Sequence, residues 1–469
     1  MADLGWTQQD IATACSGQWL SQTTVPHFSS INIDSRSLTP DQFFIAIPGK
    51  NHDGHAFIND AIQKGCLGIL VQKNRCDHRL ITVCQRKNIA CIQVDDSVKA
   101  LGDLARYHRN RSGVKVVAIT GSNGKTSTKE LTAHVLSQRF STLYTLGNFN
   151  NEIGLPLTLL RLNSQHQMAV IELGMNHIGE ISRLADICIP DIGIITNIGY
   201  AHLEGVGSIE GVIQAKGELI EKLSPAGHAV LNADNPWVMQ LAKKTNLPIH
   251  CYGISETAQV RADKIQVTTN GSYFELVLPT ERIPINLPAI GRFMVHNALA
   301  AACTGYILGL SGHEIQKGLT LFRPVSGRMN IMDIGQIHVV NDTYNANPSS
   351  MEASILTFME MNPKNRGFLV LGDMFELGVD AEKLHRNIGE KLGKLDGIHL
   401  FATGQLALQY TLGAKSVGMP EQNVFWGSKP EIRRQLKNQL QPGDWVFVKG
   451  SRGMNMETIV AGLQELNIN

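Results

Sequence analysis

The stretch Ala118-Ile-Thr-Gly-Ser-Asn-Gly-Lys-Thr-Ser-Thr128 decides the fold of the central part of this chain. It joins a β-branched run at residues 114–119 to a segment of helical periodicity, which predicts a strand, a glycine turn and a helix. Glycines in such a turn let backbone N–H groups surround an anion at the helix N-terminus, where a lysine and a hydroxyl reach the outer phosphates and magnesium. The stretch therefore predicts a nucleoside triphosphate site made by Gly121, Ser122, Asn123, Gly124, Lys125, Thr126 and Ser127.

The glycine spacing differs from that of the common phosphate loop. Gly121 lies three residues before Gly124, whereas the common loop has its first glycine five residues before the second, where this chain has Ile119. The stretch is thus a shortened variant of that loop. An incidental strand, turn and helix is the alternative, but it leaves the order of glycines, lysine and hydroxyl unexplained.

Length and charge limit the classes of protein. A chain of 469 residues exceeds one ordinary domain, and we expect three, at residues 1–100, 101–323 and 324–469. With 42 basic and 41 acidic residues the formal charge is +1, so no net field attracts nucleic acid or an anionic membrane. The expected partners are small molecules.

The cysteines and the apolar runs indicate the compartment. Eight cysteines are scattered without a C-x-x-C pair, which fits buried free thiols in a reducing environment better than disulfides or a zinc site. The sequence contains no run of about 18 apolar residues and no signal-peptide pattern. We therefore expect a cytoplasmic protein that does not insert into a membrane.

Alternating strand and helix patterns predict an α/β fold in each unit. The first is a small α/β domain with strands expected at residues 43–47, 67–71 and 90–94. Two of its loops carry polar residues, Ser35 with Arg36 and Asp53 with His55, and each pair is either a ligand contact or part of a solvated loop. The last unit is Rossmann-like, without a glycine fingerprint, and its expected strands are residues 337–341, 367–371, 398–403 and 445–449.

The central unit is predicted to be a doubly wound sheet, with an antiparallel excursion at residues 260–290. Ligands of such sheets lie beyond the carboxyl ends of the strands, and polar residues follow each expected strand. Glu172 and His202 lie at two of these ends and are the candidates for a metal site, whereas Lys216 alone reads as a surface lysine. The expected strands are residues 116–119, 168–173, 192–196 and 229–231.

Taken together, these segments resemble the Mur ligases over nearly the whole chain. The phosphate loop has the shortened spacing of that family and of the folylpolyglutamate ligases. The other segments that carry the resemblance are Gly147-Asn-Phe-Asn-Asn-Glu-Ile-Gly154, Glu172-Leu-Gly-Met-Asn-His-Ile-Gly-Glu180, Asp342-Thr-Tyr-Asn-Ala-Asn-Pro-Ser-Ser-Met351, Leu371-Gly-Asp-Met-Phe-Glu-Leu-Gly378 and Val448-Lys-Gly-Ser-Arg452.

The resemblance implies ATP and Mg²⁺ as cofactors and a role for each matching residue. The implied catalytic residues are Lys125, Lys216, His202 and Arg328. The implied metal ligands are Thr126, Glu172, His202 and Lys216, the last as a carbamate. Beyond the phosphate loop, ATP is expected to contact Asn297, Arg328 and, through its ribose, Asp342. The implied substrate contacts are Ser35, Arg36, Asp53, His55, Asn148, Asn151 and Asn345.

One segment departs from the family pattern. Many relatives read Gly-x-His-Asn-x-x-Asn, but this chain has Phe293 and Met294 where His-Asn is common. Asn297 keeps the place of the asparagine that reads adenine, and His296 falls out of register and inherits no role. Adenine specificity is therefore expected to rest on Asn297.

Within the family, the motifs resemble those of the enzyme that adds D-Ala-D-Ala to UDP-N-acetylmuramoyl-tripeptide through an acyl phosphate. Both substrates are small molecules, and a monomer is expected. A sister Mur ligase or a folylpolyglutamate-type ligase is the alternative within the class. A phosphate-loop nucleotide switch without ligase activity is the alternative from another class.

Overall fold

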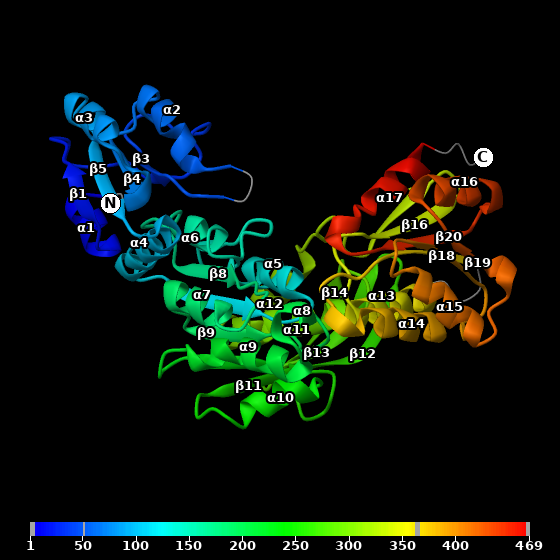
Figure 1. The fold of residues 1–469 in the computed structure, drawn as a ribbon. Coiled ribbons are helices and arrows are strands. Elements are labelled where there is room, and N and C mark those ends of the chain that lie inside the picture. The colour runs from blue at the N-terminus through cyan, green and yellow to red at the C-terminus, as the bar shows by residue number, and fades with distance from the viewer. Residues whose placement is uncertain (1–4, 50–51, 362–365, 466–469) are drawn as a thin grey trace.

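The computed structural model describes residues 5–49, 52–361 and 366–465, and the remaining residues of the three predicted domains lie outside this description. The described residues form three separate sheets of five, nine and six strands, each flanked by helices. The sheets follow one another along the chain, with the central one in the middle of the molecule (Figure 1). The three-domain α/β architecture expected from the sequence is thereby confirmed.

The first sheet has the strand order β1-β5-β4-β3-β2 and is parallel except for β1. The three predicted strands are present as β3, β4 and β5, whereas β1 and β2 were not predicted. The strands are β1 (Gln18–Ser21), β2 (Ile31–Asn32), β3 (Phe43–Ile45), β4 (Gly68–Gln72) and β5 (Ala90–Val94). The helices are α1 (Gln8–Cys15), α2 (Ile58–Gln63), α3 (His78–Arg86) and α4 (Ser97–Ser112).

Helix α4 links the first two units. Leu101 and Leu104 are fully buried in the core of the first sheet. One turn further on, the Arg109 guanidinium donates to the carbonyl oxygen of Cys188 at 3.0 Å and pairs with Asp191 at 3.2 Å, both in the central unit. The predicted boundary between residues 100 and 101 falls inside this helix, so the exact boundary stays a prediction.

The central sheet has the order β14-β13-β12-β11-β10-β9-β6-β8-β7. It is parallel from β7 to β12 and antiparallel from β12 to β14, so the predicted excursion at the edge is confirmed. Its strands are β6 (Lys115–Thr120), β7 (Thr142–Tyr144), β8 (Met168–Glu172), β9 (Ile192–Ile195), β10 (His228–Asn232), β11 (Ile249–Gly253), β12 (Val260–Thr268), β13 (Gly271–Val277) and β14 (Arg282–Leu287).

Helices cover both faces of this sheet. Residues of α5, α11 and α12 pack in the core on one face, and residues of α7, α9 and α10 pack on the other. Strand β6 lies between β8 and β9, which places its carboxyl end at the point where the strand order reverses. The helices are α5 (Lys125–Leu136), α6 (Gly154–Leu159), α7 (Glu180–Cys188), α8 (Leu203–Val206), α9 (Ile209–Glu221), α10 (Pro236–Ala242), α11 (Arg292–Ile307) and α12 (Gly312–Thr320).

The third sheet has the order β15-β16-β20-β17-β18-β19 and is parallel except for β15. The four predicted strands are β16, β17, β18 and β20. The strands are β15 (Asn330–Ile334), β16 (Ile337–Asp342), β17 (Gly367–Gly372), β18 (Ile398–Thr403), β19 (Val424–Trp426) and β20 (Trp445–Lys449). The helices are α13 (Pro348–Met361), α14 (Ala381–Leu392), α15 (Leu408–Ser416), α16 (Lys429–Gln439) and α17 (Glu457–Gln464).

In the part of the chain that the structure describes, no helix combines the length and the apolar character needed to cross a bilayer.

Candidate active site

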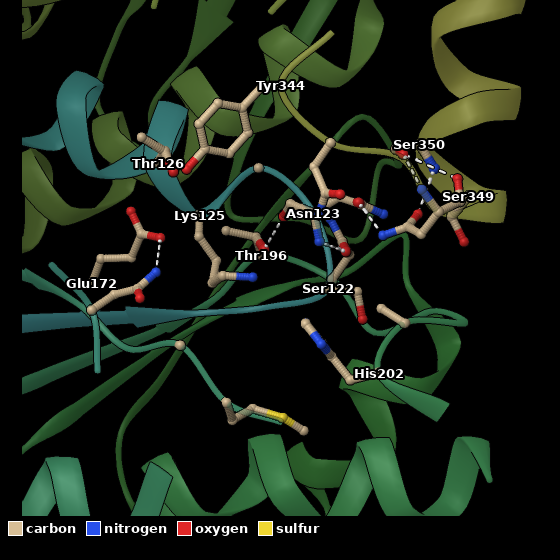
Figure 2. Close-up of a pocket in the computed structure, with 18 of the residues that line it drawn as sticks. Ser122, Asn123, Lys125, Thr126, Glu172, Thr196, His202, Tyr344, Ser349 and Ser350 are labelled. Carbon is tan, nitrogen blue, oxygen red and sulfur yellow. Dashed lines mark hydrogen bonds between the residues drawn. The ribbon is translucent and has the colours of Figure 1, made fainter. Parts of the chain in front are cut away.

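A cleft of about 1160 Å³ lies between the central and the C-terminal sheets. The phosphate loop forms one wall, and the segments that follow β16, β17 and β20 form the other. Figure 2 shows the side chains of the loop, of Glu172 and of His202 around this space. The carboxyl ends of parallel strands in the two sheets therefore face one cavity, and the polar segments that follow these strands line it.

The two loop glycines are required by the backbone. Gly124 has φ +79°, and a Cβ there would clash with the amide of Asn297. Gly121 has φ +152°, and a Cβ there would clash with the hydroxyl of Thr196. The residue after β9 and a side chain of α11 thus pack directly against the loop, and helix α5 begins at its end.

Neighbouring side chains fix the shape of the loop. Asn123 N donates to Asn197 Oδ1 at 2.9 Å, and Thr196 Oγ1 donates to the Asn123 carbonyl at 2.6 Å (Figure 2). Ser122 Oγ donates to the carbonyl of Gly199 at 3.0 Å. The loop is therefore held in one conformation by its neighbours, and Ser127 also lines the cleft.

Lys125 is a half-buried cation in the cleft. Its Nζ donates to the Gly121 carbonyl at 2.7 Å. Burial lowers its pKa, the charge of Glu172 opposes that shift, and the charge of Arg328 adds to it. No carboxylate forms a direct ion pair with Lys125 among the described residues, which leaves its charge for an anionic ligand.

Glu172, at the end of β8, has the geometry of a metal ligand. Its side chain is 2% exposed, and Oε1 accepts from Asn150 Nδ2 at 2.8 Å. Its Oε2 is buried and has no hydrogen-bond partner in the structure. A carboxylate oxygen is costly to bury unpaired, and it is the hard ligand that Mg²⁺ prefers, so this residue fits a divalent cation.

In Figure 2, His202 and Glu172 lie on opposite sides of Lys125. Its Nδ1 is 2.6 Å from Glu376 Oε2, which comes from the C-terminal domain. Burial lowers the pKa of His202, and the contact with Glu376 opposes that shift. A neutral imidazole is the form that binds metals. The structure contains no cluster of three or more His, Cys, Asp or Glu side chains arranged for a metal within its described residues.

Lys216, on α9, is not a surface lysine. Its side chain is 1% exposed, and within the described ranges no hydrogen bond or ion pair reaches its Nζ. Burial, with a smaller contribution from Lys125, lowers its pKa well below the usual value. A buried amine without a counter-ion favours the neutral form, which is the form that reacts with carbon dioxide.

Arg328 reaches the phosphate loop from the segment before β15. Its Nη2 donates to Thr126 Oγ1 at 3.0 Å, and its guanidinium lies 4.2 Å from the ring centroid of Tyr344. Arg328 Nε is buried without a partner. The side chain therefore brings a positive charge from the C-terminal side to the first turn of α5.

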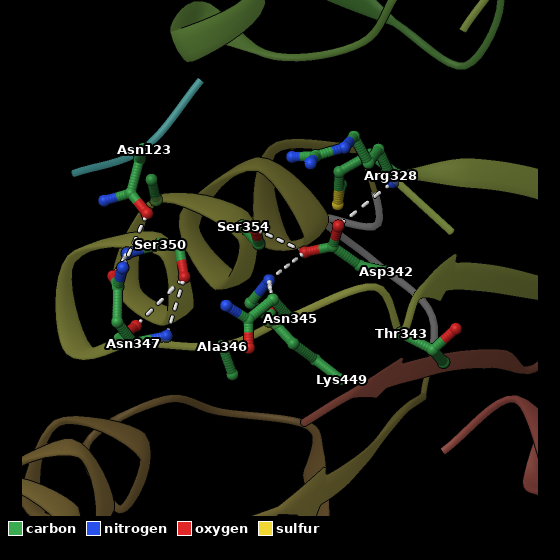
Figure 3. Close-up of polar contacts among 12 residues, drawn as sticks. Asn123, Arg328, Asp342, Thr343, Asn345, Ala346, Asn347, Ser350, Ser354 and Lys449 are labelled. Carbon is green, nitrogen blue, oxygen red and sulfur yellow. Dashed lines mark hydrogen bonds and ion pairs between the residues drawn. The ribbon is translucent and has the colours of Figure 1, made fainter. Parts of the chain in front are cut away.

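Asp342, at the end of β16, accepts three hydrogen bonds from residues of its own domain. Its Oδ2 accepts from Lys449 Nζ at 2.6 Å and from Ser354 Oγ at 2.7 Å, while Oδ1 accepts from Met329 N at 3.2 Å (Figure 3). It lines the cleft nonetheless. A ribose contact would share these oxygens with Lys449 and Ser354, and this predicted role stays a prediction.

Asn297 lies directly beneath Gly124 and is 5% exposed. Its Nδ2 contacts Met294 Sδ at 3.5 Å, so the unusual methionine packs against the asparagine. Phe293 and His296 also line the cleft, and His296 Nε2 is 2.9 Å from Asp234 Oδ2. The base-reading role of Asn297 stays a prediction.

The predicted substrate contacts divide into two groups. Asn148, Asn151 and Asn345 line the cleft. Asn151 Oδ1 also accepts from Gly154 N at 2.9 Å, and Asn345 Oδ1 accepts from Arg452 N at 3.2 Å. The second group does not line this cleft and lies in the first domain: Ser35, Arg36, Asp53 and His55.

In that first domain, the two predicted polar pairs have different partners. Arg36 is highly exposed and pairs with Asp34 at 2.8 Å. His55 Nδ1 is 2.7 Å from Asp53 Oδ1, and its Nε2 accepts from Gln72 N at 3.1 Å. The side chain of His55 is thus held by its own domain, while Arg36 is presented to solvent.

Sequence reasoning missed three residues of the cleft. Asn150 holds Glu172, Asn347 Nδ2 donates to Asn123 Oδ1 at 2.7 Å across the two domains, and Glu376 contacts His202. Each lies inside a motif quoted above, so the signal was present. Their partners are distant in sequence, and only the fold brings them together.

Comparison with known proteins agrees with this geometry. Residues 27–109 match the Mur ligase family catalytic domain, residues 119–305 match the Mur ligase middle domain, and residues 327–452 match the Mur ligase glutamate ligase domain. The chain is 37% identical to UDP-N-acetylmuramoyl-tripeptide–D-alanyl-D-alanine ligase of Escherichia coli, over 93% of this chain and 94% of the relative. The chain belongs to the Mur ligase family.

Solved structures of MurF are similar to this Mur ligase. A crystal structure of MurF from Acinetobacter baumannii superimposes with a TM-score of 0.90 at 33% identity, covering 98% of this chain and 99% of that one. MurF from Thermotoga maritima in complex with ADP has a TM-score of 0.81 at 25% identity and covers 95% and 98% of the two chains. The similarity extends over all three domains of this Mur ligase.

Proposed function

We propose that this Mur ligase joins the terminal carboxylate of UDP-N-acetylmuramoyl-tripeptide to the amine of D-Ala-D-Ala and converts ATP to ADP and phosphate. The product is a peptidoglycan precursor. The observation that carries the proposal is the convergence of Lys125, Arg328 and the unpaired Glu172 oxygen on one interdomain cleft. Relatives of this activity match the chain over nearly its full length.

ATP binds with its phosphates on the loop. The N–H groups at the start of α5 and the ammonium of Lys125 neutralise phosphate charge, and the half-buried position of Lys125 strengthens that attraction because water screens it less than at the surface. Asn297 would read the base and Asp342 the ribose. The similar Thermotoga enzyme was solved in complex with ADP, which supports an adenine nucleotide as a ligand of this fold.

Mg²⁺ fits the residues present, since Glu172 offers an unpaired buried oxygen and the pKa of His202 is lowered. Thr126, Glu172, His202 and Lys216 as a carbamate would hold it. When bound, magnesium neutralises charge on the phosphate oxygens. The carbamate turns a cation into an anion at this position, which removes the repulsion that a lysine ammonium would exert on a divalent ion.

The reaction proceeds in two displacements. An oxygen of the tripeptide carboxylate attacks the γ-phosphorus, the bond to the bridging oxygen breaks, and ADP leaves. The amine of D-Ala-D-Ala then attacks the acyl carbon, loses a proton, and releases phosphate. Lys125 and Arg328 stabilise the charge on the transferred phosphoryl group, and positioning supplies most of the acceleration.

The substrate is proposed to extend from the first domain into the cleft. Ser35, Arg36, Asp53 and His55 would contact the UDP end, and Asn148, Asn151 and Asn345 the reactive end. Because the first group lies outside the cleft, the substrate would span both regions, and domain closure would bring them together before chemistry. A monomer in the cytoplasm is the simplest setting for this cycle.

A phosphate-release assay tests the function. We expect phosphate from ATP when UDP-N-acetylmuramoyl-tripeptide and D-Ala-D-Ala are both present, and little when the amine is omitted. Release that ignores both substrates would indicate a nucleotide switch. Turnover with a single amino acid in place of D-Ala-D-Ala would indicate a sister ligase.

A further inference from the structure

The segment after β17 presents one carboxylate from the C-terminal domain on a rigid support. Met374 and Leu377 are buried in the core of that domain, at 0% and 2% exposure. Between them, Phe375 N donates to Ser451 Oγ at 2.8 Å. With both flanks anchored, Glu376 has little freedom to move relative to its own domain.

Glu376 meets the central domain through two contacts. Its carbonyl oxygen accepts from Glu204 N at 3.1 Å, and its Oε2 lies 2.6 Å from His202 Nδ1. Gly378 also approaches Glu204, since a Cβ there would lie 3.6 Å from Glu204 Cα. The backbone contact fixes the loop on α8, and the side-chain contact fixes the imidazole next to it.

Both residues of the pair have left-handed backbones although neither is glycine. His202 has φ +57° and Glu376 has φ +63°. Such conformations cost free energy and persist where the surrounding structure holds them, often at functional sites. The side chains of these two residues meet across the two domains.

We infer that Glu376 is a positioning residue for His202, an inference that rests on the proposed function. Glu376 Oε2 lies 2.6 Å from Nδ1, a close ionic contact without regular hydrogen-bond geometry. A carboxylate at this distance favours the tautomer with the proton on Nδ1, which leaves the lone pair on Nε2, the nitrogen available to a cation. No hydrogen bond to His202 Nε2 is found among the residues described. Since Glu376 belongs to the C-terminal domain, His202 acquires this orientation only when that domain is docked on α8.

The inference therefore couples docking of the C-terminal domain to completion of the metal site. Outer-shell partners of this kind typically change metal affinity by about 10- to 100-fold. A residue that only tethers two domains would change docking and leave the affinity of the docked protein for metal unchanged. Docking is therefore followed separately, by small-angle X-ray scattering of the same variants, and should stay unchanged in Glu376→Ala because the backbone contact with Glu204 remains.

The test measures Mn²⁺ binding to the full chain by electron paramagnetic resonance with a non-hydrolysable ATP analogue. We expect Glu376→Ala to weaken Mn²⁺ binding by about 10-fold or more. Glu376→Gln, whose amide oxygen still accepts from Nδ1, should recover part of the loss. Asp380→Ala, an exposed carboxylate in the same segment, is the matched control and should bind as the unaltered protein does.

A double-mutant cycle tests whether the effect of Glu376 on the metal passes through the imidazole. In a His202→Ala background, Glu376→Ala should have no further effect on Mn²⁺ affinity, because its effect passes through the imidazole. Additive losses, or an unchanged affinity in Glu376→Ala, would overturn the inference. Ligase activity of the unaltered protein is assayed in parallel, so that a failure of the proposed function is seen independently.

Discussion

The chemical state of Lys216 follows from its surroundings at the scale of a single residue. The side chain is buried without a counter-ion, and its pKa is lowered well below the usual value by that burial. A neutral amine next to a proposed metal site can take up carbon dioxide and become an anion. Lys216 was expected from the sequence alone to be a surface lysine, but its buried position on α9 favours a neutral, reactive amine.

We expect Lys216→Ala to lower turnover by about two orders of magnitude or more, with a modest loss of ATP affinity. Small carboxylic acids should restore part of the activity by filling the vacated anion position. Lys222→Ala is the control, because Lys222 ends the same helix and pairs with Asp186 at 2.8 Å outside the cleft. Near-normal turnover of Lys216→Ala would exclude the carbamate.

The buried thiols give a second prediction at this scale. Burial raises the pKa values of Cys66, Cys188 and Cys303 to about 12. In the folded protein their thiolates should form only toward that pH, so a thiol reagent at pH 7.5 should modify the half-buried Cys76 and Cys251 first. Rapid labelling of Cys303 in the folded protein at pH 7.5 would contradict this.

The stabilisation from these neutral thiols should be present below the unfolded pKa, about 8.5, and should be lost as the pH rises toward 12.

At the scale of elements, the junction of β6 and α5 explains why this loop tolerates so little change. We expect Gly124→Ala to abolish the shift in melting temperature that ATP causes, because the new Cβ meets both a φ of +79° and the Asn297 amide. Gly113→Ala is matched in conformation, with φ +65°, and has open space around it, so it should cost only about 1 kcal/mol of stability. Adding Asn297→Ala to Gly124→Ala should remove the clash with the amide and leave the unfavourable φ of residue 124. A normal ATP shift in Gly124→Ala would remove the loop from nucleotide binding.

The strands differ in how well the sequence predicts them. The buried strands β6, β8, β9, β16 and β20 were predictable because they are apolar runs bounded by turn signals. Strands β1, β2, β7, β15 and β19 were missed, since they are short or lie at or near sheet edges where little burial marks them. Strand β11 was also missed, because its first three residues are only partly buried. Glu376 and Asn150 were quoted within motifs but had no assigned partner, because their contacts join residues 174 and 22 positions apart in the chain.

At the scale of the whole molecule, residues of one domain complete the site of another. Arg328 donates to Thr126, and Asn347 donates to Asn123, both across the cleft. We expect Arg328→Ala to lower kcat by about 10³-fold with a smaller effect on ATP affinity, because its charge acts on the transferred phosphoryl group. Arg323→Ala, in the same joining segment but outside the cleft, should retain full activity. A loss confined to ATP affinity would assign Arg328 to binding alone.

The central claim is that this protein activates a carboxylate as an acyl phosphate and passes it to D-Ala-D-Ala. The most direct measurement uses UDP-N-acetylmuramoyl-tripeptide labelled with oxygen-18 in its terminal carboxylate, ATP and D-Ala-D-Ala, with mass spectrometry of the released phosphate. Because the attacking carboxylate oxygen stays on phosphorus when the amine displaces phosphate, one labelled oxygen should appear in each phosphate formed with product. Product formed with wholly unlabelled phosphate would contradict the account.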